Sequence, residues 1–196
     1  MNIFITSPSR VGSNWICDIL VDLIKPTTVL RLYSIKHLFM DRHKPPRQML
    51  KKLDSLKGNN VFKIHRWKPE DLLGIVKGKI IGMVRNYNDS VDSLMAWIKK
   101  KNNLDISLDE LKKERKNQIK NHKDMYDSMK IQNKRYLLIH YEDLIKRPMD
   151  TIKSICKFLR IRRDIEDLED IINLNRYMYK KQTIQDDTLV NNYMRR

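Results

Sequence analysis

The sequence has little cysteine and no long apolar run. Its 196 residues include two cysteines, Cys17 and Cys156, which lie far apart inside apolar patterns of helical spacing. This arrangement favours buried free thiols over a disulfide. The spacing of Cys and His matches no metal site, and no apolar run reaches the roughly 18 residues of a membrane span. We therefore expect no metal and no membrane span. Because Met1 leads directly into the first predicted strand, with no signal peptide before it, we expect a cytoplasmic protein.

Acidic residues are too few to balance the basic ones. The chain has 40 lysine and arginine residues against 24 aspartate and glutamate residues, which gives a formal net charge of +16. Such an excess indicates an anionic partner, a class that includes nucleic acids, membrane surfaces, nucleotides and phosphorylated or sulfated substrates. Lysine runs such as Lys99–Lys101 stand among Glu and Asn, which is typical of solvated helix faces.

Glycine is also scarce, and one of the five glycines lies in the first loop of the chain. The apolar run Ile3–Ile5 predicts a buried strand that ends at the polar stretch Thr6–Ser9. After Gly12, apolar residues recur at helical spacing from Trp15 to Ile24. A short strand-to-helix loop of this kind directs backbone N–H groups and the positive end of a helix dipole toward one point, which suits a phosphate group.

This loop differs from a Walker A loop. No lysine precedes Ser13, and Asn14 stands where Ser or Thr would hold magnesium. The pattern therefore predicts an anion site that uses arginine and no metal ion, rather than a site for ATP hydrolysis. The alternative is an ordinary strand-to-helix turn in which Ser13 is the N-cap.

The rest of the chain alternates between strand and helix patterns. This order predicts an α/β fold with a mostly parallel central sheet of about five strands flanked by helices. Besides the first strand and helix, the expected strands are residues 27–33, 61–65, 79–85 and 135–140, and the expected helices are residues 47–56, 69–73, 89–101, 107–130 and 149–159.

Polar residues follow three of these strands. Arg10 lies in the loop after the first strand, His65 ends the third, and Arg85 ends the fourth. Because ligands of parallel sheets bind beyond the carboxyl ends of the strands, we expect the three side chains on one rim.

Four motifs at these strand ends are similar to those of the sulfotransferases that use 3′-phosphoadenosine 5′-phosphosulfate (PAPS). They are Arg10–Trp15, Lys63-Ile64-His65, Arg85-Asn86-Tyr87 with Ser93 eight residues after Arg85, and Tyr141–Pro148. The resemblance implies a P-loop NTPase-like, three-layer sulfotransferase fold, with 1–196 as a single sulfotransferase-like domain.

The resemblance has gaps. The motifs cover about residues 1–160, and Ser13-Asn14 replaces the family's Thr-Thr. From about residue 177 the chain matches the family poorly, because the late basic, glycine-containing loop that closes over the 3′-phosphate has no counterpart. Other basic groups near the C-terminus are candidates for its role: Lys180, Lys181, Arg195 and Arg196.

The resemblance assigns PAPS binding to nine residues: Arg10, Val11, Gly12, Ser13, Asn14, Trp15, Arg85, Ser93 and Tyr141. Arg85 would grip the 3′-phosphate as a fork, with the Ser93 hydroxyl beside it. Trp15 would stack on the adenine, and Tyr141 would approach it. For both aromatic side chains, packing in the core is an equally good interpretation.

The catalytic assignments are Arg10, Lys63 and His65. Arg10, together with backbone N–H groups of the loop, would stabilise charge on the leaving phosphate. His65 would be the general base, and Lys63 points to the same face of the strand and would contact the sulfuryl oxygens. His140 also ends a strand and competes for the role of base.

Two other functions fit parts of the pattern. One is a nucleotide-dependent small-molecule kinase with a degenerate P-loop; the other is a non-catalytic basic module that binds anions or nucleic acid. Against the kinase, the loop has no lysine, and an arginine, not an aspartate, ends the fourth strand. The binding module leaves Arg10, His65 and Arg85 unexplained, so nucleic acid is not the favoured partner. We expect a hydroxyl or amine acceptor on a small molecule or glycan, in a pocket lined by residues 34–58 and 102–130.

Overall fold

A computed structural model describes residues 1–31, 47–65, 67–102 and 108–175 of the chain. In chain order, the strands and helices are β1 (Asn2–Ser7), α1 (Ser13–Ile24), β2 (Thr28–Arg31), α2 (Arg47–Asp54), β3 (Asn60–His65), α3 (Pro69–Leu73), β4 (Lys79–Val84), α4 (Tyr87–Asn102), α5 (Leu108–Ser128), β5 (Tyr136–His140), α6 (Tyr141–Lys146) and α7 (Pro148–Leu159). A further helix follows α7 and covers residues 165–175.

The strands form one five-stranded sheet in the order β2-β3-β1-β4-β5. Every pair is parallel, and Phe4 of the central strand β1 lies opposite Phe62 of β3 and Ile80 of β4. β1, β3 and β4 are almost wholly buried, as expected for a parallel sheet covered on both faces. The predicted α/β fold with a parallel central sheet is confirmed.

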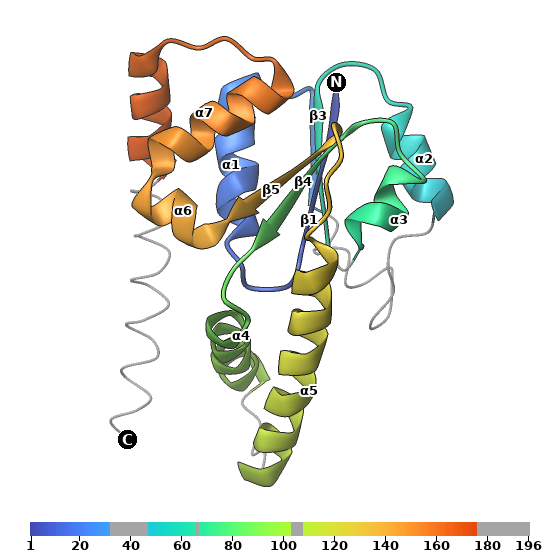
Figure 1. The fold of residues 1–196 in the computed structure, drawn as a ribbon, viewed down its shortest axis with the longest axis vertical. Helices are drawn as coiled ribbons and strands as arrows, with labels where there is room; N and C mark the ends of the chain where they lie inside the picture. Colours follow the sequence, from blue (N-terminus) through green and yellow to red (C-terminus); the bar gives the residue numbers. More distant parts are fainter. Residues whose placement is uncertain (32–46, 66, 103–107, 176–196) are drawn as a thin grey trace.

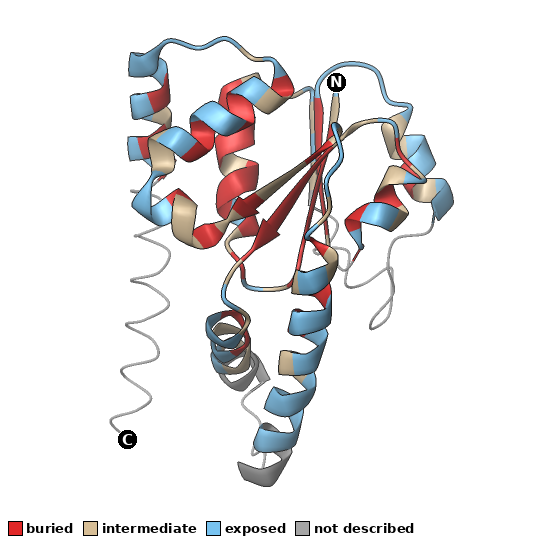
Figure 2. Ribbon diagram, in the orientation of Figure 1, coloured by how far each residue is buried: buried red, intermediate tan, exposed pale blue. Residues whose placement is uncertain are grey.

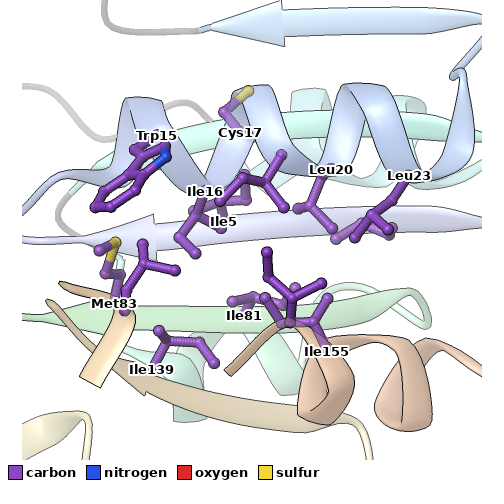
Figure 3. Packing of buried hydrophobic residues seen from close by; sticks show 14 of the residues in the cluster. Ile5, Trp15, Ile16, Cys17, Leu20, Leu23, Ile81, Met83, Ile139 and Ile155 are labelled. Atoms are coloured by element: carbon purple, nitrogen blue, oxygen red, sulfur yellow. The ribbon is translucent and has the colours of Figure 1, made fainter. Parts of the chain in front are cut away.

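Helices cover both faces of the sheet (Figure 1), with α1, α6 and α7 on one face and α2 and α3 on the other. On the first face, Ile16 of α1 packs in one buried cluster with Ile81 of β4 and Ile155 of α7 (Figure 3). On the second face, the rings of Phe4 and Phe62 lie 5.0 Å apart in another buried cluster. The sheet therefore has two apolar cores, one on each face, and the strands between them are largely buried (Figure 2).

Helices α4 and α5 lie side by side beyond the carboxyl edge of the sheet (Figure 1). Met125 and Met129, at the C-terminal end of α5 and just after it, are buried in the second core. Residues 112–117 of α5 are exposed (Figure 2). Together α4 and α5 form an arm that begins where the strands end.

Several boundaries differ from the predictions. β1 continues through the buried residues Thr6 and Ser7, whereas the sequence placed its end at Ile5. The alternative that Ser13 is an N-cap is wrong, because α1 is capped by Gly12 and Ser13 is already helical. Of the predicted strand 27–33, β2 covers Thr28–Arg31, and its last two residues lie outside the described residues.

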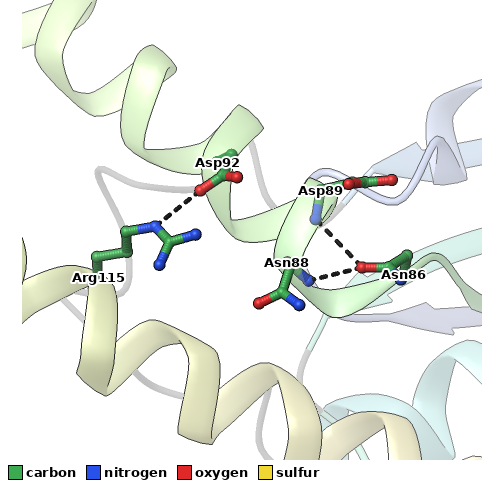
Figure 4. Close-up of polar contacts among 5 residues, drawn as sticks. All are labelled: Asn86, Asn88, Asp89, Asp92 and Arg115. Atoms are coloured by element: carbon green, nitrogen blue, oxygen red, sulfur yellow. Dashed lines mark hydrogen bonds and ion pairs between the residues drawn. The ribbon is translucent and has the colours of Figure 1, made fainter.

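Helix α4 begins two residues earlier than predicted because of its cap. The side-chain oxygen of Asn86 accepts hydrogen bonds from the backbone N–H groups of Asn88, at 3.0 Å, and Asp89, at 3.4 Å (Figure 4). These are donors that a helix cannot satisfy internally. The helix therefore begins at Tyr87, and Arg85 and Asn86 form the whole connection from β4.

Gly82 in the middle of β4 makes room for a buried tyrosine. A methyl group at Gly82 would lie 2.0 Å from the hydroxyl oxygen of Tyr136, which donates a hydrogen bond of 2.9 Å to the carbonyl of Met129. Burial raises the pKa of Tyr136 well above its usual value. This contact joins β4, β5 and the C-terminal end of α5.

Cys17 and Cys156 are both buried free thiols, as the sequence predicted. Burial raises the pKa of the Cys156 thiol, and nearby Arg163 opposes this with a smaller effect. Among the residues that the structure describes, no helix is both long and apolar enough to cross a membrane.

Candidate active site

The loop between β1 and α1, residues 8–12, is called the anion loop below. Its backbone is left-handed at Arg10, with φ 62°, and at Gly12, with φ 83°. Glycine adopts this region readily, but a non-glycine residue there carries strain of about 1–3 kcal/mol, and such strain is common at ligand sites. No side chain caps the first turn of α1. The Trp15 N–H donates a hydrogen bond of 2.9 Å to the Gly12 carbonyl, and the N–H groups of Ser13 and Asn14 before it suit an anion beside the loop.

The anion loop is held from α4 and α5 through one carbonyl group. The Ser9 carbonyl oxygen accepts a hydrogen bond of 2.8 Å from the hydroxyl of Ser90, and Nε2 of His122 lies 3.2 Å from the same oxygen. Both side chains are buried. In a planar trans peptide the carbonyl and the following N–H point in opposite directions, so this clamp also fixes the direction of the Arg10 N–H.

The Arg10 side chain reaches a residue that the sequence had assigned to the same site. Its Nε donates a hydrogen bond of 3.3 Å to the hydroxyl of Ser93 on α4. The two residues are 83 positions apart in the chain. The first and third motifs therefore meet in the folded protein.

Tyr141, the first residue of α6, joins three of the predicted site residues. The Arg85 guanidinium lies 4.7 Å from the centre of the Tyr141 ring, a cation–π contact. A methyl group at Gly12 would lie 2.7 Å from Cδ2 of the same ring, and the Trp15 ring meets it edge-on at 6.5 Å. The Tyr141 ring thus packs against the anion loop and holds Arg85 over its face.

The end of β3 supplies a buried cation. Lys63 is 3% exposed, and its Nζ donates a hydrogen bond to the side-chain oxygen of Asn14 at the start of α1. An ammonium group at this depth needs polar or anionic partners. Lys63 therefore lies within one hydrogen bond of the helix terminus beside the anion loop.

His65 follows Lys63 on the same face of β3 and is half-buried. Its Nδ1 lies 3.2 Å from the carbonyl oxygen of Ser7 and 3.4 Å from the Ser7 hydroxyl. Because a carbonyl oxygen can only accept, the contact at 3.2 Å favours a proton on Nδ1. In that tautomer Nε2 carries the lone pair that a general base needs.

His140, the competing candidate, lies farther from the anion loop. It ends β5, which is separated from β1 by β4, and its ring meets Tyr126 edge-on at 6.5 Å. His65 ends β3, the direct neighbour of β1, with His65 opposite Ser7 in the parallel register. The sheet order therefore favours His65 over His140 on position.

Most predicted site residues converge on the carboxyl edge of β3, β1 and β4, but they differ in exposure. Arg10 and Asn14 are exposed, whereas Val11 and Ser13 are buried and offer their backbone to the loop. Trp15 is 4% exposed within the first apolar core, which favours the packing interpretation left open by the sequence. Stacking of Trp15 on an adenine stays a prediction.

Sequence reasoning missed four contributors. Ser7, Ser90 and His122 support His65 or the anion loop, and the Glu142 carboxylate accepts a hydrogen bond of 2.9 Å from the Asn86 N–H. Ser90 had a detectable signal, because it lies three residues before Ser93 and thus on the same helix face. His122 had none, since it stands in a lysine-rich helix.

Two expectations lie outside this geometry. The basic candidates Lys180, Lys181, Arg195 and Arg196 are not among the described residues. Of the predicted acceptor-pocket ranges 34–58 and 102–130, residues 34–46 and 103–107 also lie outside the described residues, so the pocket stays a prediction. A cavity of about 580 Å³ lies elsewhere, between α7 and the helix at 165–175, with Lys153, Lys157 and Arg162 in its lining. It is on the flank of the molecule, away from the strand ends.

Comparison with protein families gives a match over nearly the whole chain. The model of a family described as the sulfotransferase domain matches residues 1–192. Comparison with curated proteins finds no match.

Solved structures share the fold. The chain is similar to mouse sulfotransferase SULT7A1 complexed with PAP, with 19% identity and a TM-score of 0.66 over 89% of this chain and 63% of that one. It is similar to a retinol dehydratase complexed with androsterone and the inactive cofactor PAP, with 13% identity and a TM-score of 0.58 over 89% of this chain and 64% of that one. A sulfotransferase from Alicyclobacillus acidocaldarius has 15% identity and a TM-score of 0.51 over 100% and 96%. The chain thus spans less than two thirds of the length of the mouse protein.

Proposed function

The chain belongs to the sulfotransferase domain family, and we propose that it transfers a sulfuryl group from PAPS to a hydroxyl or amine acceptor. We also propose that residues 1–196 act as one domain in this reaction. The observation that carries the proposal is the meeting of Arg10, Lys63, His65 and Arg85 at one edge of the sheet, beside a strained loop and a helix N-terminus without a side-chain cap. PAP-bound structures with the same fold support the choice of donor.

Donor binding would use the anion loop and the residues around Tyr141. The backbone N–H groups after Gly12 and the exposed Arg10 guanidinium suit the 5′-phosphosulfate. Arg85, held over Tyr141 and half-buried, suits the 3′-phosphate, with Ser93 nearby through its bond to Arg10. None of these contacts needs a metal ion.

In the proposed reaction, the acceptor oxygen or nitrogen forms a bond to sulfur while the bond from sulfur to the bridging phosphate oxygen breaks. The acceptor proton passes to Nε2 of His65, and the electron pair of the broken bond leaves on PAP. Lys63 and Arg10 stabilise the negative charge on the sulfuryl and phosphate oxygens during transfer. Positioning and electrostatics therefore supply most of the catalysis.

Calorimetry with PAP and with ATP tests the donor assignment. We expect PAP to bind at least about tenfold more tightly, because the 3′-phosphate gains a charge-assisted bond to Arg85 that ATP cannot form. Replacement of Arg85 by alanine should weaken the binding of PAP by about 10- to 100-fold, the effect of losing one charged hydrogen bond, and should weaken the binding of AMP much less. Arg162→Ala, on the flank, is the matched control.

Two results would contradict the proposal. Tighter binding of ATP, with magnesium-dependent transfer of phosphate to a small molecule, would support the kinase alternative instead. Equal weakening of PAP and AMP by Arg85→Ala would remove Arg85 from the 3′-phosphate site.

A further inference from the structure

Helix α5 has one face of exposed lysines. Lys113, Lys116, Lys120 and Lys123, called the lysine face below, are all exposed. By α-helical geometry they lie within an arc of about 80° and span about 15 Å along the helix axis. The face is separate from the buried side of the helix, where His122 and Met125 lie.

Nearby acids do not neutralise this face. Glu114 accepts a hydrogen bond of 2.7 Å from Gln118, Asp127 pairs with Lys130 at 3.0 Å, and Asp92 of α4 pairs with Arg115 at 2.8 Å. Across the residues that the structure describes, no ion pair involves any of the four lysines of the face. Asp124 and Asp127 lie four residues after Lys120 and Lys123, but neither forms an ion pair with them within the described residues, so the lysine face keeps a net positive charge.

Helix stability does not explain this arrangement. Lys116 and Lys120 are four residues apart, and Lys113 and Lys123 each lie three residues from the nearest of them. Like charges at these spacings repel one another on an isolated helix. A ligand that lies along the face and carries repeated negative charges would relieve this repulsion.

The lysine face also stands close to the proposed reaction centre. His122, between Lys120 and Lys123 in the chain, lies with Nε2 3.2 Å from the Ser9 carbonyl oxygen of the anion loop. The same turn of α5 thus contacts the anion loop on one side and presents lysines to solvent on another. A long ligand held along α5 would run past the carboxyl edge of the sheet, where α5 lies (Figure 1).

We propose that the lysine face docks a linear polyanionic polysaccharide, and that this polysaccharide is the acceptor of the sulfuryl group. The docking rests on the lysine face, and the acceptor role rests on the proposed function. A sugar chain with repeated carboxylates or sulfates has charges for the lysines and hydroxyls for transfer. A nucleic acid fits less well, because nonspecific single-strand sites interleave aromatic side chains with cations, and no aromatic residue lies between Lys113 and Lys123.

Binding of a fluorescent oligogalacturonate, a polymer of uronic acid, tests the docking surface on the full chain. We expect binding that falls steeply with NaCl concentration. In the double variant Lys116→Glu and Lys120→Glu, affinity at low salt should fall at least about tenfold, and the salt slope should shrink by about one to two units, as expected for two lost ionic contacts. PAP affinity should stay unchanged.

The matched control is the double variant Lys153→Glu and Lys157→Glu. These lysines are also exposed and four residues apart on a helix, so the net charge changes equally. The control should keep oligogalacturonate affinity within about threefold, because distant charges are screened. Equal loss in both variants, or loss in the control alone, would overturn the lysine face as the docking site.

Three further measurements separate the parts of the proposal. Uncharged dextran should not compete with oligogalacturonate. An oligothymidylate that binds as tightly, with the same dependence on Lys116 and Lys120, would overturn the choice of a polysaccharide. Labelled sulfate from PAPS should enter the oligogalacturonate with a higher KM in the Lys116/Lys120 variant. Absence of this transfer despite PAP binding would overturn the acceptor role, whereas failure of PAP binding with docking intact would count against the proposed function alone.

Discussion

The anion loop packs against one side of α5 and the lysine face lies on another, and the two regions are built in different ways. The anion loop combines a strained backbone at Arg10 with a buried hydrogen bond from Ser90 and the buried ring of His122 beside the same carbonyl. The lysine face consists of exposed side chains that form no ion pairs within the described residues. One region is fixed before a ligand arrives, and the other can adjust to it.

This difference determines how each region should respond to mutation. A preorganised site loses most of its function when one part moves, because its contacts depend on shared geometry. An exposed row of charges loses affinity in small and nearly additive steps. Changes that move the anion loop should therefore have large effects, and changes in the lysine face should have graded ones.

The largest effect is expected for His65→Ala. If His65 is the general base, sulfuryl transfer should slow by about 10²- to 10⁴-fold, whereas PAP affinity should change little because the ring contacts Ser7 rather than the anion loop. Single-turnover transfer assays and PAP calorimetry measure the two quantities. His140→Ala is the matched control and should keep most of the rate; the reverse result would assign the base to His140.

Gly12→Ala should have the next largest effect. Alanine would have to adopt the left-handed backbone of position 12, with φ 83°, and its methyl group would lie 2.7 Å from Cδ2 of Tyr141. Tyr141, and with it Arg85, therefore has to move. We expect PAP affinity to fall by at least about tenfold, because a displaced Arg85 loses its charge-assisted bond. Calorimetry measures this change.

The control for this glycine is Gly74→Ala. Gly74 has a right-handed helical backbone, and a methyl group there would meet its nearest atom at 3.6 Å. PAP affinity and the melting temperature should stay close to those of the unmodified protein. If Gly12→Ala were equally harmless, the anion loop would not be the rigid element described above.

A smaller effect is expected for Ser90→Ala, which removes one of two groups around the Ser9 carbonyl. Since His122 remains, the loop should stay in place, and PAP affinity should fall by about three- to tenfold, the loss of one neutral hydrogen bond. Ser128→Ala is the control, because Ser128 bonds to Met125 within α5 and lies away from the loop. The combined variant Ser90→Ala and His122→Phe should lose more PAP-binding free energy than the two single variants added together, which calorimetry can test.

The fold and the edge of the sheet where the site lies were predictable from the sequence. Buried strands leave a strong apolar pattern, and parallel strands bring Arg10, His65 and Arg85 to one edge whatever their spacing in the chain. The glycine at the end of the anion loop was also visible. These features depend on local pattern and on topology, both of which are encoded in short stretches.

The supporting contacts were not predictable. His122 meets Ser9 across 113 positions, and this contact depends on how α5 crosses the end of β1. The start of α4 was misplaced because the Asn86 cap is a side-chain contact that helical periodicity does not register. Trp15 had two equal interpretations, since an apolar aromatic residue has the same pattern in a core and in a binding site.

The smallest effect is expected for Asp92→Asn, which breaks the ion pair between α4 and α5 (Figure 4). The two side chains are 57% and 45% exposed, and water and salt screen such pairs strongly. Although its hydrogen bond to the Asp92 carboxylate raises the pKa of Arg115, the arginine stays charged with or without it. We therefore expect no measurable change in the melting temperature or in PAP affinity.

The same substitution sharpens the comparison between the two regions. Loss of the Asp92 carboxylate removes one negative charge and leaves Arg115 unpaired near the lysine face. Oligogalacturonate should therefore bind slightly more tightly at low salt, and the gain should vanish at high salt. A loss of PAP affinity instead would mean that this exposed pair holds α4, and with it Ser90 and Ser93, against the anion loop. The exposed ion pair would then belong to the preorganised site together with Ser90 and His122, and the distinction between a fixed loop and an adaptable exposed surface would fail.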